Sequence, residues 1–353
     1  MLVTGGLGML GTAVLADSIS PSVFTADLNV GESVTVRKTV TVDEGRPTTS
    51  KVDVYFLADT TGSMGGAING VKASAGALLA SISGLGDVQF AVGEYKDFAI
   101  SPYGSPGDFP YRLNTPMTAN QASAQAGINM WGASGGNDWP ESNLHALKTL
   151  AEDPATGWRD GSKRLVVWFG DAYGHDSVAH PGPTEAATIA ALQAASIQVE
   201  AIDVGSAGSG LDATGQATRI TAATGGHKYT GPNNAAIVAV IADAIEAAFA
   251  TYNTVTLDLS EVPAGLLASI VPGSYVGDYD REETRTFEFD LTFTGVAPGD
   301  YSFNVYGLVD GGRVATESDR IRVFNGTPVP EGGMTLPLLG MAAVLFGLLR
   351  RAK

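Results

Sequence analysis

Continuous apolar runs alternate with alanine-rich segments along the central part of the chain. The run Val52 to Ala58 is almost unbroken, and the alanine-rich segment 66–82 follows it. An apolar run of this kind is typical of a strand buried on both faces of a parallel sheet. The same alternation predicts further strands at 88–94, 165–169, 198–204 and 227–229, and further helices at 141–151, 184–195, 212–223 and 234–250. Residues 51–252 are therefore predicted to form a doubly wound α/β domain with a mostly parallel sheet.

The hydrophobic period changes to two beyond residue 253. Phe287, Phe289, Leu291 and Phe293 occupy alternate positions, and so do Tyr301, Phe303 and Val305. Such alternation predicts strands with one buried face, so residues 253–326 are expected to form part of a β-sandwich with about five strands.

Residues 17–50 contain two more strand-like stretches, 22–27 and 33–42. An immunoglobulin-like sandwich has roughly seven strands, more than the C-terminal part offers alone. We therefore expect these N-terminal strands to complete one all-β immunoglobulin-like sandwich, with the α/β domain inserted into it. This arrangement is similar to the head of integrin β subunits.

Composition limits the class of protein further. The chain has 353 residues, 45 glycines, no cysteine and a formal net charge of −16. This length argues for two domains, and disulfide bonds cannot stabilise them. The acidic balance argues against nucleic-acid binding, which requires clustered Lys and Arg. It is compatible with cation sites.

A short polar stretch follows the first predicted strand directly. Its sequence is Asp59-Thr60-Thr61-Gly62-Ser63-Met64. Open parallel sheets bind ligands beyond the carboxyl ends of their strands. One carboxylate and two hydroxyls at alternate positions are oxygen ligands of the kind that Mg²⁺ and Ca²⁺ prefer.

This stretch has other interpretations. A plain strand-to-helix turn, with Thr or Ser capping the next helix, is an alternative. An aspartic protease needs Asp-Thr-Gly twice, and a hydrolase elbow needs Gly-x-Ser-x-Gly; neither pattern occurs here. Ser63, His175 and Asp171 have no spacing that would orient a catalytic triad. No catalytic residue is therefore expected.

The stretch resembles the first metal loop of von Willebrand factor A domains. The metal-ion-dependent adhesion site of that family has the form Asp-x-Ser-x-Ser, with Thr61 in place of the first Ser here. Two later segments, 135–141 and 170–176, fall where the family has its other metal loops. The resemblance implies a Mg²⁺ site, or a Mn²⁺ or Ca²⁺ site, that includes Asp59, Thr61, Ser63 and Asp171.

The second loop is similar to that of the integrin β subtype. Its Asp138-Trp139-Pro140-Glu141 sequence implies that Glu141 is a direct cation ligand. By the same resemblance, Asp97, Asp138 and Glu141 would share a second cation, such as Ca²⁺. The Asn that the subtype has in this loop is Gly136 here, a departure that concerns the second cation. Gly65, Gly66 and Ala67 stand where the subtype has a further acidic pair, so a third cation is not expected.

A segment of about 40 residues separates the second predicted strand from the helix at Glu141, longer than ordinary connections. It is rich in aromatic residues: Tyr95, Phe98, Tyr103, Phe109, Tyr111, Trp131 and Trp139. These side chains either pack an ordered loop onto the sheet or form part of a partner-binding surface.

Both termini carry targeting patterns. Residues 1–16 resemble a signal peptide cleaved after Ala16. Gly6-Leu7-Gly8-Met9-Leu10-Gly11 also matches a dinucleotide-binding fingerprint, but no βαβ unit follows it. Residues 327–353 resemble a PEP-CTERM sorting signal, with a Pro-Glu motif, an apolar helix at 334–349 and a basic end; an ordinary tail anchor is the alternative. The resemblance implies processing by an exosortase and transient membrane attachment through this helix.

These features together predict an exported, cation-dependent adhesion or protein-interaction module of the cell envelope. Its expected partner is a protein or other acidic ligand at the cell surface, whose carboxylate would complete the metal coordination. Two alternatives stay open: an envelope protein whose metal site only stabilises the fold, and a secreted metal-assisted hydrolase with His175 as base.

Overall fold

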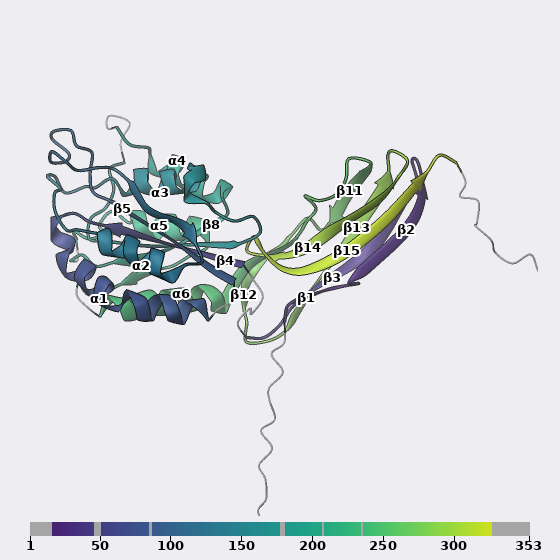
Figure 1. Ribbon diagram of the computed structural model, residues 1–353, viewed down its shortest axis with the longest axis horizontal. Coiled ribbons are helices and arrows are strands. Elements are labelled where there is room, and N and C mark those ends of the chain that lie inside the picture. Colours follow the sequence, from purple (N-terminus) through teal and green to yellow (C-terminus); the bar gives the residue numbers. More distant parts are fainter. Residues whose placement is uncertain are drawn as a thin grey trace, which may run out of the picture.

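The computed structural model describes residues 16–45, 51–84, 87–176, 181–206, 208–233 and 236–326. They form an α/β part and an all-β part that lie end to end (Figure 1). The predicted signal peptide, apart from Ala16, and the predicted sorting tail with its apolar helix lie outside the described residues. Within the residues described, no helix is both long and apolar enough to cross a membrane.

The α/β part is built on a six-stranded sheet with strand order β6-β5-β4-β7-β8-β9. All pairings are parallel except the antiparallel one between β5 and β6. This confirms the predicted α/β class with a mostly parallel sheet. The strands are β4 (Lys51–Asp59), β5 (Asp87–Tyr95), β6 (Arg112–Thr118), β7 (Lys163–Gly170), β8 (Ile197–Asp203) and β9 (Lys228–Thr230).

Helices cover both faces of this sheet (Figure 1). One face packs against α1 (Gly65–Ser83), α2 (Gln121–Met130) and α6 (Ile237–Ala250). The other packs against α3 (Asn143–Glu152), α4 (Glu185–Ala194) and α5 (Gln216–Thr224). Short 3-10 turns lie at Gly62–Met64 and Pro154–Thr156. Because β4 is central and covered on both faces, every residue from Val52 to Asp59 is buried.

The long aromatic segment is not the single loop expected from the sequence, because it contains β6 and α2. The Asn120 side chain caps α2 by accepting hydrogen bonds from the backbone amides of Ala122 at 2.9 Å and Ser123 at 3.2 Å. Strand β6 was missed because it is a mostly polar edge strand that contains a proline. Most of the segment's aromatic residues pack inward, whereas Trp139 is 46% exposed.

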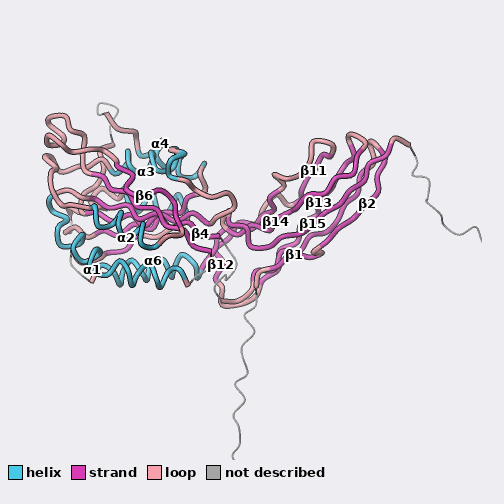
Figure 2. Tube along the Cα trace, viewed as in Figure 1, coloured by secondary structure: helices cyan, strands magenta, loops and turns pink. Residues whose placement is uncertain are grey.

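The all-β part consists of two sheets that enclose one apolar core. One sheet has the order β1 (Ser18–Ser20), β3 (Ser33–Val42), β13 (Arg285–Gly295), β11 (Leu266–Val271). The other has the order β12 (Tyr275–Asp280), β10 (Thr251–Asp258), β14 (Gly299–Val309), β15 (Gly312–Phe324), β2 (Val23–Asn29). The tube view in Figure 2 shows these strands running side by side.

Strands from before and after the α/β part share these sheets. Strand β3 pairs antiparallel with β13 along its whole length, and β2 pairs parallel with β15. Six strands follow residue 250, one more than the roughly five expected from the hydrophobic period. The immunoglobulin-like assignment stays a prediction.

The two parts meet at the amino end of β7. The backbone amide of Arg313 in β15 donates to the carbonyl of Gly161 at 2.9 Å. The Lys163 ammonium donates to the Ala248 carbonyl at 2.6 Å and lies 3.2 Å from the Asp310 carboxylate. The all-β part therefore joins the sheet at the end opposite the loops that follow Asp59 and Gly170.

Candidate metal centre

The first loop begins at Asp59, the last residue of β4. Its side chain is fully buried, and its Oδ1 accepts hydrogen bonds from the Thr61 amide at 2.8 Å and the Thr61 hydroxyl at 2.7 Å. Its Oδ2 is buried with no hydrogen-bond partner among the described residues. Burial, together with the nearby charge of Asp171, raises the pKa of Asp59 to about 7.

The third loop places Asp171 beside the first. Asp171 directly follows β7, and its Oδ1 accepts a hydrogen bond from the Ser63 hydroxyl at 3.0 Å. Burial raises the pKa of Asp171 above its usual range. Parallel pairing of β4 with β7 brings these two loops to one edge of the sheet.

The second loop contributes Glu141. Its amide donates to the Tyr173 carbonyl at 3.0 Å, and its carbonyl accepts from the His175 amide at 3.1 Å, so the second and third loops form a short parallel bridge. Its Oε2 is buried without a hydrogen-bond partner in the described part of the chain. Burial raises the pKa of Glu141 to about 10, with further contributions from the carboxylates of Asp59, Asp97 and Asp138.

The three loops surround a hollow of about 180 Å³. Of the five residues predicted for the first site, Thr61, Ser63, Glu141 and Asp171 line it, and Asp59 lies beneath it in contact with Thr61. Gly136 closes one side in a left-handed conformation with φ of +75°, and a Cβ there would lie 3.0 Å from Oε1 of Glu141. Only glycine allows this close approach of the backbone.

These residues fit a hard divalent cation. Their donor atoms are all oxygens, which suits Mg²⁺ and Ca²⁺. Asp59 and Glu141 each have a buried carboxylate oxygen without a partner among the described residues, which is costly unless a cation or proton compensates it. Neighbouring carboxylates also raise the pKa values of Asp59 and Glu141, and a divalent charge would offset that repulsion.

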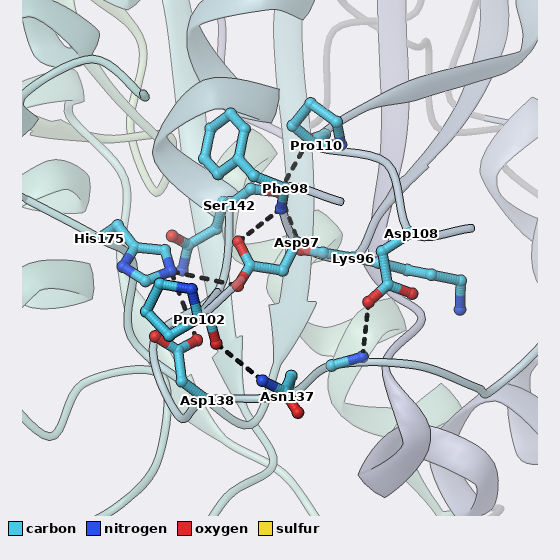
Figure 3. Close-up of polar contacts among 12 residues, drawn as sticks. Lys96, Asp97, Phe98, Pro102, Asp108, Pro110, Asn137, Asp138, Ser142 and His175 are labelled. Carbon is cyan, nitrogen blue, oxygen red and sulfur yellow. Dashed lines mark hydrogen bonds and ion pairs between the residues drawn. The ribbon is translucent and has the colours of Figure 1, made fainter. Parts of the chain in front are cut away.

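A second group of candidate ligands lies beside the first. One ligand atom from each of Asp97, Asp138 and His175 lies within 4.8 Å of the others. Figure 3 shows the imidazole facing both carboxylates, with Nε2 at 3.2 Å from Asp97 Oδ2 and 3.6 Å from Asp138 Oδ1. Burial raises the pKa of Asp138 to about 6, and the imidazole opposes that shift.

The sequence placed Glu141 in this second group, whereas the structure groups His175 with Asp97 and Asp138. The reason is local geometry. Glu141 turns its Oε1 toward Gly136 and the first loop, while the bridge between the two loops brings His175 to Asp97.

Two charged residues that hold the loops in place were missed by sequence reasoning. The buried Lys96 ammonium donates to three backbone carbonyls, those of Thr60, Gly132 at 2.9 Å and Ser134 at 2.7 Å. The Asp108 carboxylate accepts from the Gly136 amide at 3.0 Å (Figure 3). The sequence feature that could have identified Lys96 is its place directly before Asp97, at the carboxyl end of β5.

Two amide side chains complete this support. Asn233 accepts from the Ala67 amide at 2.7 Å and donates to the Ser63 carbonyl at 3.0 Å. Gln216 pairs with both backbone groups of Gly174, at 2.7 Å and 3.2 Å. Each side chain thus fixes the backbone of one of the loops that surround the hollow.

No protein-family model and no curated protein matches this sequence. Several solved structures are similar at low identity. A von Willebrand factor type A protein from Catenulispora acidiphila is 13% identical, with a TM-score of 0.45, over 88% of this chain and 74% of that one. The pilus adhesin SpaC from Lactobacillus rhamnosus GG, in its open conformation, is 14% identical, with a TM-score of 0.40, over 82% and 45%. Proximal thread matrix protein 1 from the mussel byssus is 15% identical, with a TM-score of 0.43, over 61% and 51%.

This chain therefore spans about half the length of the pilus adhesin and of the byssus protein.

Proposed function

We propose that this chain is a divalent-cation-dependent adhesion or protein-interaction module that binds an acidic group of a partner, and that it is not an enzyme. One observation carries the proposal. Two buried carboxylate oxygens, on Asp59 and Glu141, have no partner among the described residues and belong to a cluster that borders an open hollow. Such oxygens are suited to a cation that a second molecule can reach from the hollow.

The roles of the residues follow from their contacts. Thr61, Ser63 and Glu141 line the hollow and would contact the cation, which is Mg²⁺, Mn²⁺ or Ca²⁺ in this proposal. Asp59 and Asp171 accept hydrogen bonds from those two hydroxyls and so aim the hydroxyl oxygens toward the hollow. A bound divalent cation would supply the positive charge that attracts a partner's carboxylate.

A second cation, such as Ca²⁺, is part of the proposal. Asp97 and Asp138 would hold it, with His175 as the nearest third ligand where the sequence had suggested Glu141. Its role would be to stabilise the second loop, which carries Glu141 and the exposed Trp139. Trp is frequent among the residues that contribute most to binding, so Trp139 is our candidate partner contact.

The finer assignments rest on the sequence patterns. We propose that the α/β part is a von Willebrand factor A domain of the integrin β type, inserted into an immunoglobulin-like sandwich. Residues 1–16 and 327–353 support export, exosortase processing, membrane attachment through the helix at 334–349, and a location at the cell envelope or outside the cell.

A capture experiment tests the proposal. The chain is immobilised and incubated with envelope extract in Mg²⁺ or in chelator, and with extract whose carboxyl groups have been blocked as amides. Capture is expected in Mg²⁺ only, and both chelation and carboxyl blocking should abolish it. Capture that survives in chelator would contradict the proposal.

Variants separate this function from its alternatives. Asp59→Asn should lose capture together with cation binding, whereas Trp139→Ala should lose capture and keep cation binding. Melting that depends on cation, without capture that does, would favour the purely structural role. An activity abolished by His175→Asn would favour the enzyme, although His175 does not line the hollow.

A further inference from the structure

The core of the all-β part contains a buried lysine. Lys38 lies at an inward-facing position of β3, between Val36 and Val40 on the same face, and its side chain is completely inaccessible to solvent. The surrounding core is otherwise built from aliphatic and aromatic residues. Burial of an ammonium among such residues is costly unless other groups compensate it, so the side chains that contact Lys38 need an explanation.

Two carboxyl groups from the facing sheet contact this lysine. The Lys38 Nζ donates a hydrogen bond to Oε1 of Glu317 and lies 3.4 Å from Oδ1 of Asp319. Both acidic residues belong to β15, two positions apart, and both are buried. The second oxygens, Oε2 of Glu317 and Oδ2 of Asp319, have no hydrogen-bond partner among the described residues. One amine and two carboxyl groups are thus enclosed together.

Aromatic rings surround this triad. In the strand register, Phe289 lies beside Lys38, and Phe24 and Phe303 lie on either side of Asp319. The ring centroid of Phe24 is 4.8 Å from Nζ of Lys38. Val305 lies beside Glu317 in the same register. These neighbours leave the three polar groups in a medium of low polarity.

Low polarity changes the protonation of the acids. Burial raises the pKa of Glu317 to about 7 and raises the pKa of Asp319 above its usual range, although the lysine opposes both shifts. A proton is therefore held within the triad near neutral pH. Transfer of a further proton from the ammonium to a carboxylate gives a neutral amine beside a neutral acid, the reactive forms for amide formation.

We propose that Lys38 and Asp319 form an intramolecular amide bond and that Glu317 carries the proton. Glu317 accepts the hydrogen bond from Nζ, so it is placed to take the ammonium proton. The free amine then attacks Cγ of Asp319, and the new C–N bond forms as one C–O bond of the protonated carboxyl group breaks. Glu317 returns that proton to the departing oxygen and accepts the second proton of the attacking nitrogen, so one water molecule leaves, the product is a neutral amide, and Glu317 ends protonated. No oxidant, reductant or cofactor is needed.

The link would join the two sheets of the all-β part covalently. Lys38 belongs to the β3 sheet and Asp319 to the β15 sheet. The two residues are 281 positions apart, and the whole α/β part lies between them in the sequence. Tension applied to the chain outside residues 38 and 319 would then bypass the α/β part.

Mass spectrometry of the full chain decides between this bond and an ordinary buried ion pair. After denaturation and trypsin digestion, the wild type should yield one branched fragment that joins the peptide beginning at Lys38 to the peptide beginning at Val314. Its mass should be the sum of the two peptides minus one water molecule. Acylated Lys38 should also resist cleavage by trypsin. Two separate peptides of full mass would overturn the proposal.

Variants test the assigned roles. Asp319→Ala and Glu317→Gln should both yield unlinked peptides, and Glu317→Gln should keep the native circular dichroism spectrum at 25 °C while melting at a lower temperature. A link from Lys38 to Glu317 in the wild type, or a link that persists in Glu317→Gln, would overturn the assignment of acceptor and proton carrier. Cyclisation of Asp319 onto its own backbone also removes one water but gives no branched fragment, and that result would contradict the proposal.

Discussion

Asp59 binds Thr61 through one carboxylate oxygen only. Its Oδ1 accepts both the amide hydrogen at 2.8 Å and the hydroxyl hydrogen at 2.7 Å, and its Oδ2 accepts no hydrogen bond from the described residues. The two oxygens of one side chain therefore have separable tasks. The first shapes the turn, and the second contributes charge to the candidate metal centre.

This separation makes Asp59→Asn informative. The amide keeps an oxygen that can accept both Thr61 hydrogen bonds, while the buried charge is lost. In chelator the variant should be as stable as the wild type or more stable. In excess Mg²⁺ the wild type should melt roughly 5 to 10 °C higher than in chelator, the shift expected for a ligand at about 100 times its Kd. The variant should show no such shift in thermal denaturation.

Asp243→Asn is the matched control, because Asp243 is an exposed aspartate on α6, away from the metal loops. Its shift with Mg²⁺ should equal that of the wild type. A cation-induced shift that persists in Asp59→Asn would show that this carboxylate is not needed for binding.

Gly136→Ala should remove cation binding through sterics. The new methyl group would lie 3.0 Å from Oε1 of Glu141, in the space beside the hollow. Gly31→Ala is the control, since Gly31 also has a positive φ, of +85°, but open space around its Cβ position. Both variants should lose about 1 kcal/mol of stability from the left-handed backbone. Calorimetric titration with Mn²⁺ should show binding by Gly31→Ala and none by Gly136→Ala.

Lys96→Met tests whether Lys96 affects cation affinity mainly through its positive charge or mainly by holding the ligand loops in place. Loss of a nearby positive charge should by itself strengthen cation binding. However, three buried carbonyls would lose their donor, at a cost of about 1 to 3 kcal/mol each, and the loops that they belong to carry the ligands. We expect the second effect to prevail and affinity for Mg²⁺ to fall at least tenfold. Lys148→Met, at a partly exposed site on α3, should leave affinity unchanged, and tighter binding by Lys96→Met would refute this ranking.

Stability should depend on pH through Glu200, a buried residue of β8 away from the metal loops. Its carboxylate accepts hydrogen bonds from Gln198 at 2.6 Å and the His227 amide at 2.9 Å, yet burial raises its pKa from 4.5 to about 7. A raised pKa means that the folded protein holds the proton more tightly than the unfolded chain. The contribution of this residue is therefore fully present below pH 4.5 and is lost as the pH rises through 7, by about 3 kcal/mol in all.

Urea denaturation of the wild type and of Glu200→Gln, from pH 4.5 to 8.5, measures this contribution. As the pH rises, the unfolding free energy of the wild type should fall relative to that of Glu200→Gln. A difference that stays constant across this range would contradict the prediction.

The central strands could be predicted from sequence because burial on both faces requires apolar residues at nearly every position. Val52 to Ala58 is apolar at nearly every position, and β4 occupies that stretch. Strand β6 has no such pattern, since an edge strand needs few apolar residues. An edge strand also tolerates Pro116, which has no backbone N–H to donate. Helix α5 begins at Gln216 rather than 212, after the left-handed Gly215.

The same contrast holds for the candidate site. Asp59 and Asp171 could be placed because each lies at the carboxyl end of a parallel strand, and parallel strands end at one edge. The pairing of His175 with Asp97 could not, because it depends on a loop-to-loop bridge. Nor could the partners of Lys38, which lie on β15 far along the chain and meet it only after both sheets have packed.

The attachment of the all-β part at the amino end of β7 has a mechanical consequence. The candidate centre lies beyond the opposite ends of β4 and β7, so a captured partner that pulls away would load these strands lengthwise. Under such a load the lateral hydrogen bonds between neighbouring strands share the force as a group, instead of opening one after another like a zipper. Attachment at this end would thus strengthen the proposed capture against a partner that pulls away along the strands.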